Sequence, residues 1–301
     1  MWTVDYMMRT LLLRAIQAAV HAGYRILQIY NTDFQVWRQY AQSPVDTANS
    51  HADQIIRKFL HSTQIPILSQ KSKEVPYQVR STWEAFWLVD SLDGSREFVA
   101  KTGEFTVNIA LILNHEPVLG VIFAPYMNLL YFADENSVAY KLERNFQMAG
   151  LIDSDMFEVF TCEIKSLFSQ CKKLPLPQPV HRPYTIVGSR SHNTEELEQY
   201  LLEKEATIKN LEFVSIGSSL KFCVVAEGSA DEYPRTGPTM EWDTAAGHAI
   251  ARCAGAQVVQ SGTGLPLLYN KASLKNPNFI VRRARPKETE KLLSYHDSCE
   301  F

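Results

Sequence analysis

Apolar residues near the start of the chain recur at helical spacing, and further on they gather in short runs. The helical repeat predicts an amphipathic helix over residues 8–31, and the break at Ser43-Pro44-Val45 separates it from a second helix with a buried face around Ala52 and Ile56. Short turns separate the later apolar runs, so we expect an antiparallel sheet there. The runs that predict strands are 65–68, 86–89, 106–113, 118–123, 129–133 and 138–142.

The second half of the chain alternates strand and helix patterns, which indicates a layered α/β arrangement. Between the halves, residues 172–179 are rich in proline and are expected not to join a sheet. We therefore predict three parts: an N-terminal α+β part over 1–145, a divergent insertion or connector over 146–182, and a C-terminal α/β part over 183–301. Strands are expected at 185–188, 213–216, 258–260 and 279–282, and helices at 194–204, 219–227 and 244–254.

The composition limits the class of protein but does not indicate which reaction or ligand is involved. The chain has 301 residues, 46% of them hydrophobic and 21% charged, which is ordinary for a globular protein. Thirty basic and thirty-three acidic residues give a net charge of −3, so no nucleic-acid polymer is expected as a partner. Five widely spaced cysteines without a CxxC pair favour reduced thiols and a cytoplasmic location. No signal peptide and no transmembrane segment are expected.

The segment Trp87-Leu88-Val89-Asp90-Ser91-Leu92-Asp93-Gly94-Ser95 carries the clearest candidate chemistry. An apolar strand ends there in two aspartates, and Gly-Ser then opens a predicted helix. Carboxylates at a strand end suit a hard divalent cation, and amides at a helix start suit a phosphate. A capped turn explains the Asp-Gly pair equally well.

A second acidic segment is Glu241-Trp242-Asp243-Thr244-Ala245-Ala246-Gly247-His248. An acidic residue directly before an alanine-rich helix is by itself more typical of a helix cap than of a metal ligand. A metal-binding role for the two acidic segments is better supported when they are considered together with the motifs that accompany them.

Taken in order, these motifs resemble the inositol-monophosphatase-like family of metal-dependent phosphatases. The segments Gly103 to Leu111, Ser189-Arg190-Ser191-His192, Gly217 to Cys223 and Tyr233-Pro234-Arg235 are similar to its CysQ-type 3'(2'),5'-bisphosphate nucleotidase branch. The resemblance implies a layered αβαβα sandwich and two or three Mg²⁺ ions. It implies an enzyme that removes the 3'-phosphate of adenosine 3',5'-bisphosphate to give AMP.

The resemblance also assigns roles to single residues. It implies that the carboxylates of Asp90, Asp93 and Asp243 and the carbonyl of Leu92 bind the metals, and that Gly94 and Ser95 contact the phosphate. Residue 95 also belongs to the implied catalytic set, with residues 49 and 70. The positions implied to contact substrate are Ser191, His192, Gly217, Lys221 and Arg235.

Three positions depart from the family pattern. Asn49 and Gln70 stand where the family has an aspartate and a metal-ligating glutamate, and Lys71 adds a positive charge beside the latter. We expect Asn49 to accept a hydrogen bond from the residue-95 hydroxyl and Gln70 to offer a neutral oxygen to a metal, both more weakly than a carboxylate. Ser91 replaces a proline, and this change is expected to matter less. Activity is therefore expected to be weakened.

Other functions stay open at this stage. An inositol or sugar phosphate is the alternative substrate, and a catalytically impaired nucleotide-binding relative is the alternative class, favoured by Asn49 and Gln70. The expected partner is a small nucleotide or phosphate ester. A homodimer and a peripheral association with the inner membrane are compatible with the resemblance.

Overall fold

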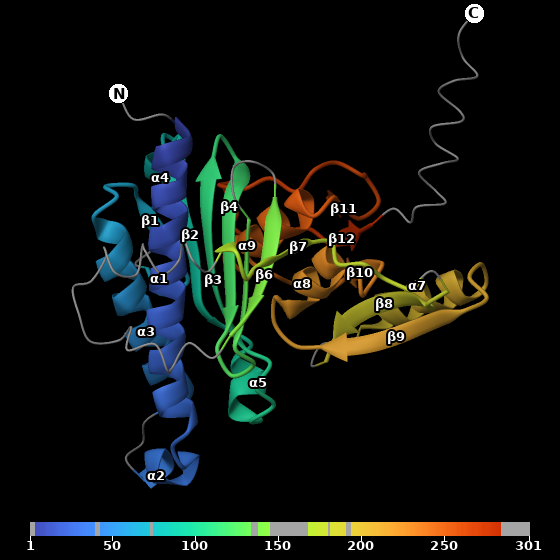
Figure 1. The fold of residues 1–301 in the computed structure, drawn as a ribbon, viewed down its shortest axis with the longest axis horizontal. Helices are drawn as coiled ribbons and strands as arrows, with labels where there is room; N and C mark the ends of the chain where they lie inside the picture. The colour runs from blue at the N-terminus through green and yellow to red at the C-terminus, as the bar shows by residue number, and fades with distance from the viewer. Residues whose placement is uncertain are drawn as a thin grey trace, which may run out of the picture.

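Two β-sheets alternate with three layers of helices in the computed structural model, which describes residues 4–39, 43–72, 75–133, 138–144, 168–179, 181–190 and 194–283 (Figure 1). Two long helices cover the outer face of the first sheet, two more helices lie between the sheets, and one covers the far face of the second sheet. This αβαβα order confirms the expected fold class. The helices of these layers are α1 (Val4–Tyr30), α3 (Pro44–His61), α8 (Leu220–Glu227), α9 (Glu241–Cys253) and α7 (Glu195–Glu205).

The first sheet has seven strands in chain order, β1 to β7, and only the β1–β2 pair is parallel. Both faces of β2 are buried, and its first five residues, 85–89, form a continuous apolar run. Trp87 and Val89 face the core under α1 and α3, whereas Phe86 and Leu88 face the core around α8 and α9. The strands are β1 (Ile67–Ser69), β2 (Ala85–Asp93), β3 (Thr106–Leu113), β4 (Glu116–Ala124), β5 (Leu129–Ala133), β6 (Ala139–Glu143) and β7 (Lys172–Leu174).

The second sheet is mixed and has five strands in the order β11-β12-β10-β8-β9. Val187 of β8 packs in the core around α8 and α9, and a Cβ on the adjacent Gly188 would lie 3.5 Å from Leu197 of α7. The sheet is therefore covered on both faces. Its strands are β8 (Tyr184–Ser189), β9 (Leu211–Ile216), β10 (Glu232–Arg235), β11 (Gln257–Gln260) and β12 (Phe279–Arg282).

One sequence expectation is wrong: residues 172–179 are not incompatible with a sheet. Their first three residues form β7, which pairs with β6 at the edge of the first sheet. Proline is tolerated at sheet edges, and Pro175 follows the last paired residue, so no ladder hydrogen bond is lost. The division of the chain at 145 and 182 stays a prediction, because most of the connector lies outside the described residues.

Three short helices complete the described chain, and only the last was expected. None of its helices is long and apolar enough to cross a bilayer. The short helices are α2 (Phe34–Gln39), α4 (Tyr77–Arg80) and α5 (Ser95–Val99).

Candidate active site

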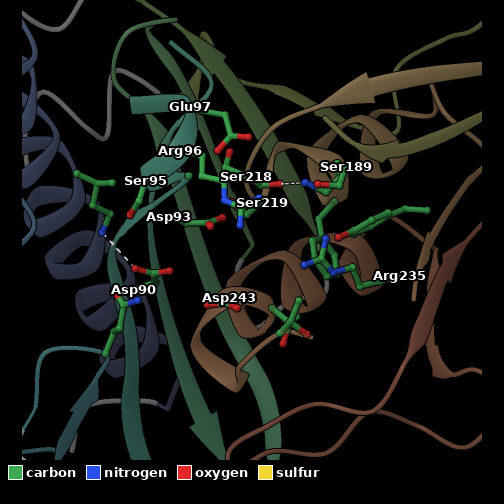
Figure 2. A pocket seen from close by; sticks show the side chains of 18 residues that line it. Asp90, Asp93, Ser95, Arg96, Glu97, Ser189, Ser218, Ser219, Arg235 and Asp243 are labelled. Atoms are coloured by element: carbon green, nitrogen blue, oxygen red, sulfur yellow. Dashed lines mark hydrogen bonds between the residues drawn. The ribbon is translucent and has the colours of Figure 1, made fainter. Parts of the chain in front are cut away.

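A polar cleft of about 270 Å³ lies where the end of β2 meets the first turns of α5, α8 and α9 (Figure 2). Asp90, Asp93 and Asp243 all line it, although the third comes from the other end of the chain. All of the residues assigned to metal or phosphate by resemblance therefore share one cavity. Gly94, Ser95, Gln70, Leu92, Lys221 and Arg235 line it as well.

An irregularity in β2 brings its two aspartates into the same cleft. Side chains three apart on a regular strand point to opposite faces. Here Asp90 pairs with Asn108 and Asp93 pairs with Thr106. Between these two pairs β2 therefore contains one more residue than β3. Such a bulge re-aims a side chain. The bulge explains why both carboxylates line the cavity.

Asp243 lies in the first turn of α9, and one carboxylate oxygen accepts a hydrogen bond from the Met240 N–H at 2.8 Å. The helix begins at Glu241, so the expectation of an acidic N-cap residue before the helix is wrong: Met240 is the N-cap, and Asp243 caps the helix from its third position. The cap does not exclude a second role, because the same side chain also lines the cleft.

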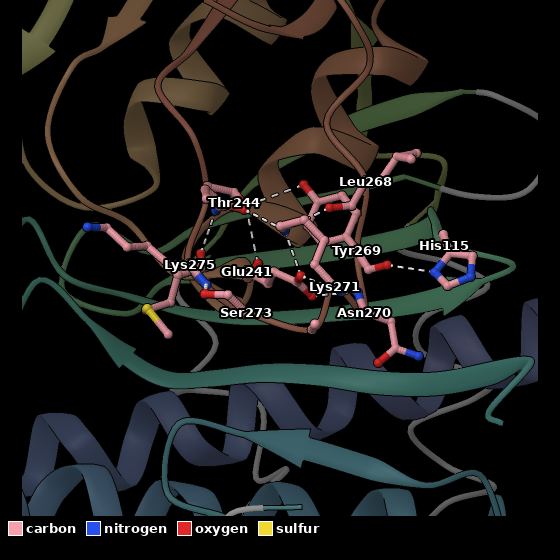
Figure 3. Close-up of polar contacts among 12 residues, drawn as sticks. His115, Glu241, Thr244, Leu268, Tyr269, Asn270, Lys271, Ser273 and Lys275 are labelled. Carbon is pink, nitrogen blue, oxygen red and sulfur yellow. Dashed lines mark hydrogen bonds and ion pairs between the residues drawn. The ribbon is translucent and has the colours of Figure 1, made fainter. Parts of the chain in front are cut away.

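The loop after β11 holds the start of α9 in place (Figure 3). Glu241, which is fully buried, accepts hydrogen bonds from the backbone N–H of Asn270 at 2.6 Å and of Lys271 at 3.0 Å, and from the Lys271 ammonium at 2.6 Å. Asn276 donates to the Thr244 hydroxyl and to the Met240 carbonyl. These contacts fix the turn that carries Asp243.

Replacing Lys271 by Met is expected to lower the free energy of unfolding by about 2–4 kcal/mol, because a buried carboxylate then loses its cation. Urea unfolding measures the loss. Lys275→Met is the matched control, since Lys275 is exposed on the same loop. Equal stability of the two variants would show that the Lys271–Glu241 pair does not hold α9.

The three carboxylates repel one another in a low-dielectric cleft. Burial raises the pKa of Asp90 well above its usual range, and the charges of Asp93 and Asp243 raise it further. Burial, followed by the charge of Asp93, raises the pKa of Asp243 to about 7. Burial also lowers the pKa of Lys221 to about 8, although nearby Asp93 acts in the opposite direction. Full ionisation of all three carboxyl groups would therefore place more negative charge in the cleft than its protein neighbours neutralise.

This donor set suits a hard divalent cation, which prefers carboxylate and carbonyl oxygens. In the described part of the chain, however, no three His, Cys, Asp or Glu side chains are already arranged to hold a metal. The Ser219 N–H engages Asp93, while protonated Asp90 donates a hydrogen bond to the carboxylate of Asp243. A metal would have to displace the proton of the Asp90–Asp243 contact, and its charge would offset the burial and the repulsion that raise the pKa values of both groups.

The backbone conformation at position 94, in the pair assigned to phosphate, requires a glycine. Gly94 has φ +88°, and a Cβ there would lie 2.9 Å from the Glu104 carbonyl. A side chain would be strained at this position. Ser95 follows as the first residue of α5, exposed and lining the cleft (Figure 2).

Only some of the residues assigned to substrate line the cleft. Lys221 is 4% exposed and donates to the carbonyls of Ile216 and Ser218 at 3.3 and 2.5 Å. Arg235 is tied to the carbonyls of Gly237 and Pro238 at the rim. Gly217 does not line the cleft: its N–H donates to Glu104 at 2.8 Å. Ser191 and His192 lie outside the described residues.

The sequence missed several residues of the cleft wall. Glu97 and Tyr233 line it, and Glu104 supports it through the Gly217 N–H and a two-bond contact with Arg190 at 2.7 Å. Glu97 and Glu104 lie within or beside quoted motifs, but their spacing carried no signal for a ligand-binding role.

The three departures from the family pattern lie together. Asn49 is buried, and its amide oxygen accepts a hydrogen bond from the Ser91 hydroxyl at 2.9 Å. The expected partner, the Ser95 hydroxyl, is not the donor, so that expectation is wrong. The Asn49 amide nitrogen donates to the Gln70 side-chain oxygen at 3.1 Å. Ser91, expected to matter little, is therefore the first member of a continuous chain of hydrogen bonds.

Lys71 does not place its charge in the cleft. Its ammonium is 3.4 Å from a carboxylate oxygen of Asp46, whose side chain is 72% exposed. Asp46 therefore pairs with Lys71 near the surface and does not replace the missing carboxylate at position 49.

The model of the inositol monophosphatase family matches residues 7–299, and the chain belongs to this family of phosphatases. Within the family it is similar to proteins named 3'(2'),5'-bisphosphate nucleotidase CysQ. The Shigella flexneri protein of that name is 41% identical over 270 residues, covering 88% of this chain and 96% of that protein. The one from Escherichia coli strain K12 is 40% identical over the same length and shares.

Solved structures agree with this placement. The crystal structure of CysQ from Bacteroides thetaiotaomicron superimposes with a TM-score of 0.82 at 42% identity, covering 94% of this chain and all of that one. Inositol monophosphatase II from Staphylococcus aureus shares the fold, with a TM-score of 0.64 at 17% identity and 90% of both chains covered.

Proposed function

We propose that this protein is a Mg²⁺-dependent phosphomonoesterase that removes the 3'-phosphate of adenosine 3',5'-bisphosphate. The observation that carries the proposal is the convergence of Asp90, Asp93 and Asp243 with Gly94 and Ser95 in one cleft. Similarity to the CysQ nucleotidases supports the substrate. A cytoplasmic location and a homodimer stay predictions of the sequence.

The residues that the resemblance assigns to metal and phosphate each have a role in this proposal. Asp90, Asp93, Asp243 and the Leu92 carbonyl would hold Mg²⁺, which when bound polarises a phosphoryl oxygen and makes water a better nucleophile. The Gly94 and Ser95 amides would orient the phosphoryl group from the start of α5. Gln70, at the end of β1, lines the side of the cleft next to Asp90, and Asn49 acts through it.

The remaining contacts would serve the nucleotide. Lys221 and Arg235 line the cleft and supply positive charge, which would neutralise a second phosphate. We also assign Ser191, His192 and Gly217 to the nucleotide. The assignment rests on their motifs alone, and for Gly217 it means holding the loop that carries Ser218.

Arg235→Ala is expected to raise KM for adenosine 3',5'-bisphosphate by about 10–100-fold, because a charged hydrogen bond to phosphate is lost. The KM for a small phosphate monoester should change much less. Arg282→Ala, on an exposed position of β12, is the control. An equal rise for both substrates would argue against a role in recognising the second phosphate.

Phosphate release from adenosine bisphosphate, inositol phosphate and fructose bisphosphate at several Mg²⁺ concentrations tests the function itself. We expect the bisphosphate nucleotide to be used best and turnover to need a high Mg²⁺ concentration. The proposal is wrong if a sugar or inositol phosphate is clearly preferred. Tight nucleotide binding without turnover would favour the catalytically impaired relative, for which Asn49 and Gln70 are the supporting residues.

A further inference from the structure

We propose that Ser91 and Asn49 form a relay that sets the orientation of the Gln70 side-chain amide, so that Gln70 presents N–H groups to the cleft and withholds its oxygen. The inference rests on the metal-dependent function proposed above. It makes Ser91 and Asn49 positioning residues, and it differs from the sequence expectation that Gln70 offers an oxygen to a metal.

The relay starts at a buried hydroxyl. Ser91 is fully buried, and its hydroxyl donates to the Asn49 amide oxygen at 2.9 Å. It makes no other side-chain hydrogen bond among the described residues. If the Asn49 amide were turned around, this hydroxyl hydrogen would lose its acceptor, and an unsatisfied buried donor is costly. Ser91 therefore fixes the direction of the Asn49 amide.

The direction of Asn49 in turn fixes that of Gln70. With its oxygen engaged by Ser91, Asn49 has only its NH₂ group to offer, and this group donates to the Gln70 oxygen at 3.1 Å. The Gln70 backbone is held by its N–H bond to the Val89 carbonyl at 3.2 Å, at the point where β1 runs beside β2. The free end of the side-chain amide is consequently its nitrogen.

This orientation reverses the partial charge that Gln70 presents to the cleft, from negative to positive. An amide nitrogen has two donors and no lone pair for a cation, so it repels a metal and attracts a phosphoryl oxygen or a carboxylate. An aspartate at position 49 would have only acceptors to offer. It would accept from Ser91 and from the Gln70 nitrogen together, and the Gln70 oxygen would then face the cleft.

Hydrogen exchange in the metal-free protein tests the relay directly. Side chains labelled with ¹⁵N are assigned through the Gln70→Ala and Asn49→Asp variants. We expect the Asn49 NH₂ protons to be protected and the Gln70 NH₂ protons to exchange rapidly, with Gln70 becoming protected in Asn49→Asp. Protected Gln70 NH₂ protons in the unsubstituted protein would overturn the proposal. Ser91→Ala should weaken the protection of Asn49.

Mn²⁺ binding, followed by electron paramagnetic resonance, tests what the relay does to a cation. Asn49→Asp should tighten Mn²⁺ binding about tenfold more when residue 70 is Gln than when it is Ala, because residues in one network are coupled. An equal gain in both backgrounds would show that the added charge acts alone, and the relay would be refuted. Gln78→Glu, on the exposed face of α4, controls for added charge elsewhere.

The two proposals can fail separately. If Asp243→Asn leaves Mn²⁺ binding unchanged, the metal site of the proposed function is wrong. The exchange experiment contains no metal, so it still decides whether Gln70 is oriented by Ser91 and Asn49.

Discussion

Asp243→Asn is expected to abolish phosphate release while making the metal-free protein more stable. Partners outside the ligand set of a metal site already cost about 10–100-fold when removed, so loss of a ligand should cost at least about 100-fold. Asparagine keeps the oxygen that accepts the Met240 N–H, so α9 retains its cap. The lost activity would then report the missing charge.

The stability gain has a defined pH window. The pKa of Asp243 is about 7 in the folded protein, against an ordinary value of 3.8, because of burial and the charge of Asp93. The folded state therefore binds more protons than the unfolded state between these values, and stability falls as pH rises from about 4 to 7. Asparagine removes this loss, so the variant should gain most at pH 7 and least near pH 4.

Thermal unfolding in EDTA measures the gain, at about 2–4 °C for each kcal/mol of relieved repulsion. Added Mg²⁺ should raise the midpoint of the unsubstituted protein and leave that of the variant nearly unchanged. A variant that is less stable than the unsubstituted protein in EDTA at pH 7 would contradict the proposed cost of burying the Asp243 charge beside Asp93.

Restoring both acidic residues, Asn49→Asp with Gln70→Glu, is expected to raise turnover by about 10²-fold and to lower the Mg²⁺ requirement. A positioned acid–base partner typically contributes about 10²–10⁴-fold. A glutamate at position 70 would bring a charge to the cleft even with Asn49 present, because one carboxylate oxygen can accept from the Asn49 NH₂ while the other stays free. The Asn49→Asp change alone would act through Gln70.

Initial phosphate release against Mg²⁺ concentration for the four proteins separates these contributions. We expect Gln70→Glu to act mainly on the Mg²⁺ requirement. If the unsubstituted protein were already fast at low Mg²⁺ and both changes were neutral, another residue would supply the water-activating group. A double variant that binds nucleotide without turning it over would favour the binding-only alternative.

The elements were predictable where the pattern of apolar residues is continuous. Residues 106–113, 129–133 and 279–282 form strands with the predicted bounds, because each is rich in β-branched, aromatic or other apolar residues. β7 and β10 were missed, since each is short and contains or borders a proline. The position of Gly94 and Ser95 at the start of a helix was also predictable, because it depends on a motif of neighbouring residues.

By itself, the sequence determined the layered fold, the family and which aspartates are the candidate metal ligands. Periodicity and the order of motifs can both be obtained from the sequence alone. Only the tertiary structure brought Asp90 and Asp243 into one cleft and placed Gly217 behind it, against Glu104. It also showed that the three unusual positions form one hydrogen-bonded chain. The physical reason is that a hydrogen bond depends on which side chains meet across layers and in which direction each donates, and spacing along the chain encodes neither.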